Sequence, residues 1–105
     1  MNSFKIMQNE KIDNGIDYTE TKTIFTTVKG YLDRMTGTDD NKIQDAKVEE
    51  STHILITDKF VDGITDKMEV VFNSRLYFIE YVDNVMELNH HLEIYLKYGG
   101  VYNGV

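Results

Sequence analysis

Six short segments of the chain are rich in β-branched and aromatic residues, and residues that favour turns separate them. The clearest segment, residues 91–98, alternates strictly: Leu92, Ile94 and Leu96 fall on one side, and His91, Glu93, Tyr95 and Lys97 fall on the other. This period of two is typical of a strand with one face in a core. The sequence therefore predicts strands at residues 4–7, 23–34, 52–57, 67–72, 76–82 and 91–98.

The turns between these segments must form without proline, which the chain lacks. Asn14-Gly15, Asp62-Gly63 and Asn73-Ser74 supply residue types that tolerate turn conformations. Asn73-Ser74 separates two expected strands by two residues, which predicts a tight hairpin. Gly30 lies inside the second expected strand, where a glycine suggests a bulge or bend.

The length and composition fit one domain spanning residues 1–105. A chain of 105 residues with 41% hydrophobic residues can bury one core. No long segment repeats apolar residues at the helical period of 3.6. We therefore expect a mainly β protein, a small antiparallel β-barrel of about six strands, with a β-sandwich as the alternative arrangement.

The most distinctive segment is the 17-residue connection Met35–Ser51 between the second and third expected strands. Connections longer than about 12–15 residues are uncommon in compact domains and are often functional. Residues 39–50 fit either a short helix or an exposed polar loop. The segment is net acidic, and we take it as a candidate channel or partner loop, with candidate residues Thr38, Asp39, Asp40, Asn41, Lys42, Asp45, Lys47, Glu49 and Glu50.

A second candidate surface lies on the expected strand 76–82. Strict alternation places Tyr77, Ile79 and Tyr81 on one face, opposite a face that is also largely apolar. Only one face can point into a small core, and monomers seldom expose large apolar patches. Either the long loop or another subunit would then cover Tyr77, Ile79 and Tyr81, and the seven tyrosines of the chain favour another subunit. The alternative is half-buried tyrosines in a monomer.

Charge argues against a nucleic-acid-binding function. The chain has 11 basic and 18 acidic residues, a formal charge of −7, and only Arg34 and Arg75 supply guanidinium groups. Proteins that read nucleic acid usually present a basic surface to the phosphates. Specific binding of DNA or RNA is therefore not expected.

No pattern for catalysis or metal binding stands out. The absence of cysteine excludes disulfides and thiolate chemistry, and the adjacent His90 and His91 would point to opposite faces of a strand. His53, expected to be partly buried, lies in another strand. We expect no catalytic residues, metal or cofactor. The chain also shows no apolar run of about 20 residues and no secretory leader pattern, so we expect synthesis in a cytoplasm and no membrane partner.

Several stretches resemble the small head–tail joining proteins, also called head closure or stopper proteins, of long-tailed bacteriophages. The resemblance covers about residues 20–98. The features follow in the order Val28-Lys29-Gly30-Tyr31-Leu32, a long polar loop, Ser51-Thr52-His53-Ile54-Leu55-Ile56, the hairpin Met68 to Ile79, a turn through Val82-Asp83-Asn84, and His91-Leu92-Glu93-Ile94-Tyr95-Leu96. The resemblance depends on this order and on two stretches: Thr52-His53 before an aliphatic strand, and the hairpin sequence Phe72-Asn73, three further residues, then Tyr77-Phe78-Ile79. At Ser74 the chain departs from the family, whose turn commonly has glycine after the asparagine.

The resemblance implies a small β-barrel with an extended loop between its second and third strands. It implies a homo-oligomer, a dodecameric ring beneath the portal and adaptor proteins that closes the DNA-filled head and receives the tail. DNA would pass through the ring without specific binding. The protein would be made in the host bacterial cytoplasm and end in the virion neck.

Other functions remain open on the sequence alone. Within the phage neck, the alternative is a tail-completion protein. Outside it, the chain fits a small cytosolic β-barrel module that binds a protein or peptide. An enzyme of unknown type is a third alternative, which would require a pocket with converging polar groups.

Overall fold

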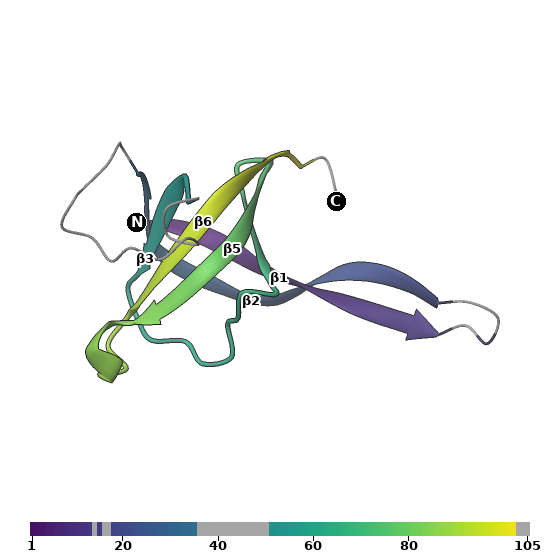
Figure 1. The fold of residues 1–105 in the computed structure, drawn as a ribbon, viewed down its shortest axis with the longest axis horizontal. Helices are drawn as coiled ribbons and strands as arrows, with labels where there is room; N and C mark the ends of the chain where they lie inside the picture. Colours follow the sequence, from purple (N-terminus) through teal and green to yellow (C-terminus); the bar gives the residue numbers. More distant parts are fainter. Residues whose placement is uncertain (14, 16–17, 36–50, 103–105) are drawn as a thin grey trace.

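The computed structural model describes residues 1–13, 15, 18–35 and 51–102, which form a closed antiparallel barrel (Figure 1). The strand order around the barrel is β1-β2-β3-β6-β5-β4. The strands are β1 (Asn2–Asp13), β2 (Tyr18–Arg34), β3 (His53–Thr57), β4 (Glu69–Phe72), β5 (Arg75–Asn84) and β6 (Leu92–Val101), with one 3-10 turn, η1 (Val85–Glu87). The expected mainly β fold and six-strand barrel are confirmed, and the sandwich is not formed.

Side chains from all six strands fill the barrel. Leu92, Ile94 and Leu96 of β6 are at most 1% exposed, as their alternation predicts. Burial of an aliphatic or aromatic side chain stabilises the fold by about 1.5–3 kcal/mol. The buried hydrophobic cluster consists of Phe4, Ile6, Val28, Leu55, Ile64, Val70, Tyr77, Ile79, Leu92, Ile94 and Leu96.

The first two strands are much longer than expected. β1 and β2 pair continuously from Asn2 opposite Gly30 to Asp13 opposite Tyr18. The molecule measures 51 × 26 × 24 Å, and its long axis follows the β1–β2 hairpin where it extends away from the barrel (Figure 1). We call residues 8–13 and 18–23 the arm. The arm was missed because its polar sequence has no apolar face to signal a strand.

Gly30 allows a close approach between backbones. It pairs with Asn2 on one side and Thr57 on the other. A Cβ atom at Gly30 would lie 2.1 Å from the carbonyl oxygen of Ile56, so only glycine fits. Of the expected bulge or bend, the bulge is not at Gly30, because the β1–β2 register shifts between Ile6 and Met7 instead.

The predicted hairpin at Asn73-Ser74 is confirmed. Phe72 pairs with Arg75, and the two residues between them have φ angles of 52° and 58°. Positive φ at both central residues is typical of the turn whose twist matches a two-residue hairpin. Ser74 thus adopts a conformation that glycine adopts with less strain.

Candidate functional site

The expected channel or partner loop falls mostly outside the described residues. All nine of its candidate residues, and the alternative of a short helix, lie within residues 36–50. Its two ends are described. The Met35 N–H donates to the Thr52 carbonyl at 2.9 Å, and the Thr52 N–H donates to the Leu96 carbonyl at 2.8 Å. Both ends of the connection are therefore attached at one end of the barrel, which we call the loop end.

The Thr52 hydroxyl joins three segments at the loop end. It accepts a hydrogen bond from the Tyr98 N–H at 2.7 Å and lies 2.8 Å from Nδ1 of His53. It also lies 3.4 Å from the Leu96 carbonyl, to which it can donate. This network extends the contact between β3 and β6 beyond their last paired residues, so the start of β3 is firmly positioned.

His53 lies beside Tyr77, and its imidazole is half-buried, as expected. The His53 and Tyr77 rings meet edge to face with centroids 5.1 Å apart, and the Tyr77 and Tyr98 rings follow at 5.6 Å. Tyr77 is 1% exposed, whereas Tyr98 is 41% exposed. The three rings thus form an aromatic row that leads from the core to the surface at the loop end.

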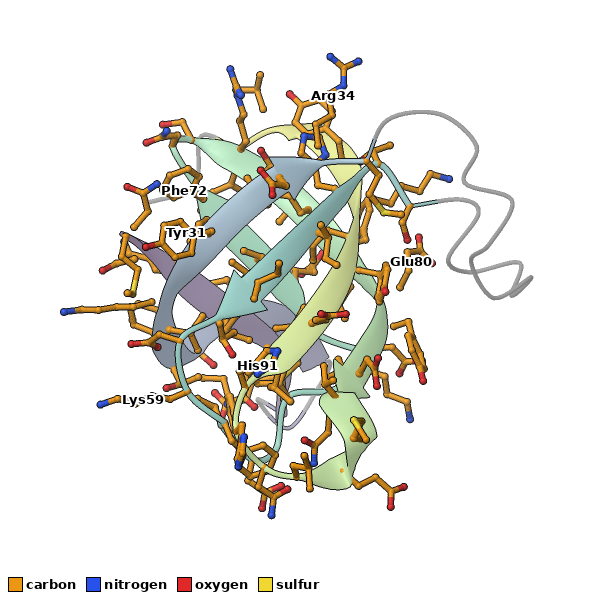
Figure 2. The ribbon with its side chains drawn as sticks, turned by 90° about the vertical axis from the view of Figure 1, so that its left-hand side faces the viewer. Tyr31, Arg34, Lys59, Phe72, Glu80 and His91 are labelled. Atoms are coloured by element: carbon orange, nitrogen blue, oxygen red, sulfur yellow. The ribbon has the colours of Figure 1, made fainter. Side chains whose placement is uncertain are left out.

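Both arginines of the chain act on His53. Arg34 pairs with His53 across β2 and β3, and Figure 2 shows Arg34 at the loop end. Burial lowers the pKa of His53, and the positive charges of Arg34 and Arg75 lower it further. His53 is therefore neutral at neutral pH, and the fixed positive charge here comes from the two guanidinium groups, which favour contact with anionic groups.

The expected interface on β5 is wrong for two of its three residues. Tyr77 and Ile79 are 1% and 3% exposed and belong to the core. The β5–β6 register shifts between Ile79 and Tyr81, so one residue is added and the alternation reverses. Tyr81 consequently points outward and is 41% exposed. A role for Tyr81 in subunit contact stays a prediction.

The outward side of β5 carries one aromatic residue that the expected alternation placed differently. Phe78 falls on the face opposite Tyr77 and Ile79, the face left for the core, yet it is 43% exposed. Its ring covers Gly99, where a Cβ atom would lie 2.6 Å from a ring carbon. Gly99 could have indicated this contact from the sequence, because a glycine within a strand often marks a place where another group packs closely against the backbone.

Tyr81 also has an aromatic neighbour. The Tyr81 and Tyr95 ring centroids lie 5.9 Å apart. Burial raises the pKa of the Tyr95 phenol, and the negative charges of Glu93 and Asp83 raise it further, followed by Tyr81. The surface around Tyr81 is therefore both aromatic and acidic.

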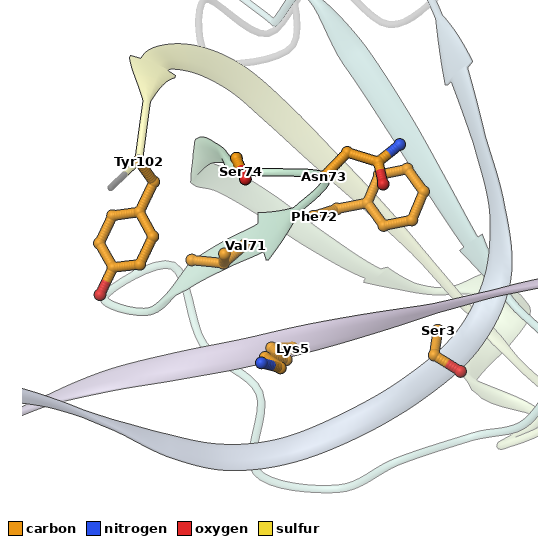
Figure 3. Close-up of a pocket in the computed structure, with 7 residues that line it drawn as sticks. All are labelled: Ser3, Lys5, Val71, Phe72, Asn73, Ser74 and Tyr102. Atoms are coloured by element: carbon orange, nitrogen blue, oxygen red, sulfur yellow. The ribbon is translucent and has the colours of Figure 1, made fainter. Parts of the chain in front are cut away.

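The described residues bring together no recognisable catalytic or metal-binding group. Among them, no three His, Cys, Asp or Glu side chains are arranged to hold a metal ion. An open hollow between β1, the β4–β5 hairpin and the C-terminal segment (Figure 3) is lined by Ser3, Lys5, Val71, Phe72, Asn73, Ser74 and Tyr102. This lining contains no carboxylate or imidazole that would activate a serine hydroxyl.

No protein-family model matches the sequence, and no curated protein matches it significantly. Across the described part of the chain, no helix combines the length and apolar character needed to cross a lipid bilayer.

Proposed function

We propose that this chain is a structural protein of the neck of a tailed bacteriophage. Copies of it form a ring, dodecameric by the resemblance, below the portal and adaptor proteins. The ring closes the DNA-filled head and presents a docking surface for the tail. In this proposal the protein is made in the host cytoplasm and ends in the virion.

One observation supports this proposal most directly. The second and third strands of a closed barrel are joined by the long acidic connection, whose base is held by the Met35–Thr52 hydrogen bond. The resemblance implies that arrangement. Repeated around a ring, a net acidic segment would surround the channel with negative potential and repel DNA from the wall.

The test adds the purified protein to DNA-filled, tailless heads of the phage that encodes it. We expect a ring at the portal vertex in electron micrographs and retention of packaged DNA. A chain that leaves the heads unchanged and their DNA leaking would contradict the proposal. Addition to isolated tails instead of heads would favour the tail-completion alternative.

A charge-reversal variant tests the channel role separately. Asp39→Lys, Asp40→Lys, Asp45→Lys and Glu49→Lys together should leave ring addition intact and slow DNA ejection. The matched control reverses four exposed carboxylates outside this segment, Asp58, Asp62, Asp66 and Glu87. Unchanged ejection in the first variant, or equal slowing in both, would show that this segment does not line the channel.

The exposed aromatic side chains favour one alternative function. Phe78 and Tyr81, both more than 40% exposed, are typical of a surface that binds protein or peptide. A monomer that ignores phage heads and loses a peptide ligand on Tyr81→Ala would support a binding module.

A further inference from the structure

The arm is the part of the β1–β2 hairpin that lies outside the closed barrel. β1 pairs with β4 only from Lys5 to Met7, and β2 pairs with β3 only from Gly30 onward. In the part of the chain that the structure describes, the arm strands therefore pair only with each other. A free strand edge is a template for another strand, and an isolated two-stranded hairpin is marginally stable in water. The arm thus fits a partner that adds strands.

The base of the arm is fixed to the barrel. Lys22 forms an ion pair with Glu69, the first residue of β4, which is 7% exposed. Next to it, the Phe25 ring lies against Gly63, where a Cβ atom would be 2.8 Å from the ring. The Asp58 N–H also donates to the Lys29 carbonyl at 2.9 Å. These contacts cover β2 next to the barrel and hold the arm in a defined direction. Among residues 1–13, 18–35 and 51–102, nothing pairs with the outer edges of the arm.

The two arm edges differ, and each can pair with the other. Within one hairpin, Lys11 lies opposite Glu20, and Glu10 lies opposite Thr21. If the arms of neighbouring copies point the same way, β1 of one copy is antiparallel to β2 of the next. Without stagger, the register of the hairpin repeats between copies, with Glu10 opposite the next copy's Thr21. The backbone groups on the two outer edges can then form the hydrogen bonds of an antiparallel sheet.

We propose that the arm joins copies of this chain through pairing of β1 of one copy with β2 of the next. This contact uses two different edges, so it leaves a free edge at each end and continues until a ring closes. The placement of that ring in a phage neck rests on the proposed function; the contact between copies does not.

The absence of cysteine makes the test specific, because any introduced thiol is the only one. Glu10→Cys and Thr21→Cys, at exposed positions of β1 and β2, are prepared separately and mixed under mild oxidation. Gln8→Cys replaces Glu10→Cys in a second mixture to detect a two-residue stagger. Lys97→Cys, exposed on β6 outside the arm, is the matched control. Circular dichroism and thermal unfolding verify that each variant folds.

We expect the Thr21→Cys protein to form a disulfide-linked heterodimer with one β1 variant roughly tenfold faster than with Lys97→Cys, because pairing raises the effective thiol concentration. Equal rates for both β1 variants and the control would overturn the proposal. Faster homodimers of a single variant would also overturn it, since they indicate a two-fold contact between identical edges.

The two proposals fail in different ways. Heads that gain a ring while the arm thiols show no preferred cross-link would leave the neck function and remove the arm contact. Preferred cross-links from a protein that does not bind heads would leave the arm contact and remove the neck function.

Discussion

Tyr77 and Tyr81 lie four residues apart on the same strand and on opposite sides of the barrel wall. Tyr77 is 1% exposed and Tyr81 is 41% exposed. Strict alternation would place them on one face. The register shift between Ile79 and Tyr81 adds one residue and reverses the alternation, so the core and the outer surface each receive a tyrosine.

This reversal predicts unequal effects of alanine substitution. Tyr77→Ala should lower the free energy of unfolding by about 3–5 kcal/mol, because it leaves a cavity where a large ring was buried. Tyr81→Ala should lower it by less than about 1 kcal/mol. Urea unfolding measures both, and the milder Ile79→Val, expected to lower it by about 0.5–1.5 kcal/mol, remains informative if Tyr77→Ala does not fold. Equal losses at Tyr77 and Tyr81 would contradict the assignment.

Gly30→Ala should be among the single substitutions that lower the free energy of unfolding most. Its Cβ atom would meet the Ile56 carbonyl oxygen at 2.1 Å, and two paired backbones would have to separate. We expect a loss of more than about 3 kcal/mol in unfolding free energy. Gly99→Ala is the comparison, because there the obstacle is the Phe78 side chain, which can rotate away. Urea unfolding should give a lower midpoint for Gly30→Ala than for Gly99→Ala. A Gly30→Ala variant more stable than Gly99→Ala would contradict the close backbone approach at Gly30.

Ser74→Gly should stabilise the protein. Ser74 has a φ of 58° in the β4–β5 turn, a conformation that raises the energy of residues with a Cβ atom. Glycine removes this strain, but its greater freedom in the unfolded chain opposes folding. We therefore expect the free energy of unfolding to rise by a net amount of about 0.5–1 kcal/mol. The melting temperature should rise for Ser74→Gly and not for Ser74→Ala. A lower melting temperature for the glycine variant would mean that the serine is not strained.

His53 should make stability depend on pH below its ordinary pKa. Burial, Arg34 and Arg75 lower its pKa in the folded protein below 6.5, so the unfolded chain binds more protons as the pH falls through that value. The stability that depends on neutral His53 is therefore present above pH 6.5 and is lost below it.

The comparison of variants isolates this contribution. Between about pH 7.5 and about pH 5.5, His53→Gln should lose less unfolding free energy than the unsubstituted protein. His90→Gln, at an exposed position, should lose as much as the unsubstituted protein. Identical losses for all three proteins in urea unfolding would show that His53 makes no such contribution.

Local patterns predicted the parts of the fold that depend on neighbouring residues. The alternation around Ile94 and the two residues Asn73-Ser74 were sufficient for a buried strand and a tight hairpin. The loop end shows the opposite case. Arg34, His53 and Arg75 lie far apart in the sequence, and no local pattern indicates that strand pairing brings them together.

The sequence by itself determined that this chain is a mainly β protein with a long acidic connection after its second strand, because side-chain period, turn residues and charge are local properties. Only the tertiary structure decided the rest. Closure of the barrel shifted the register near Tyr81, brought a second backbone against Gly30, and left the polar arm outside. Each outcome depends on which strands become neighbours, and the energy of that choice comes from contacts between distant residues.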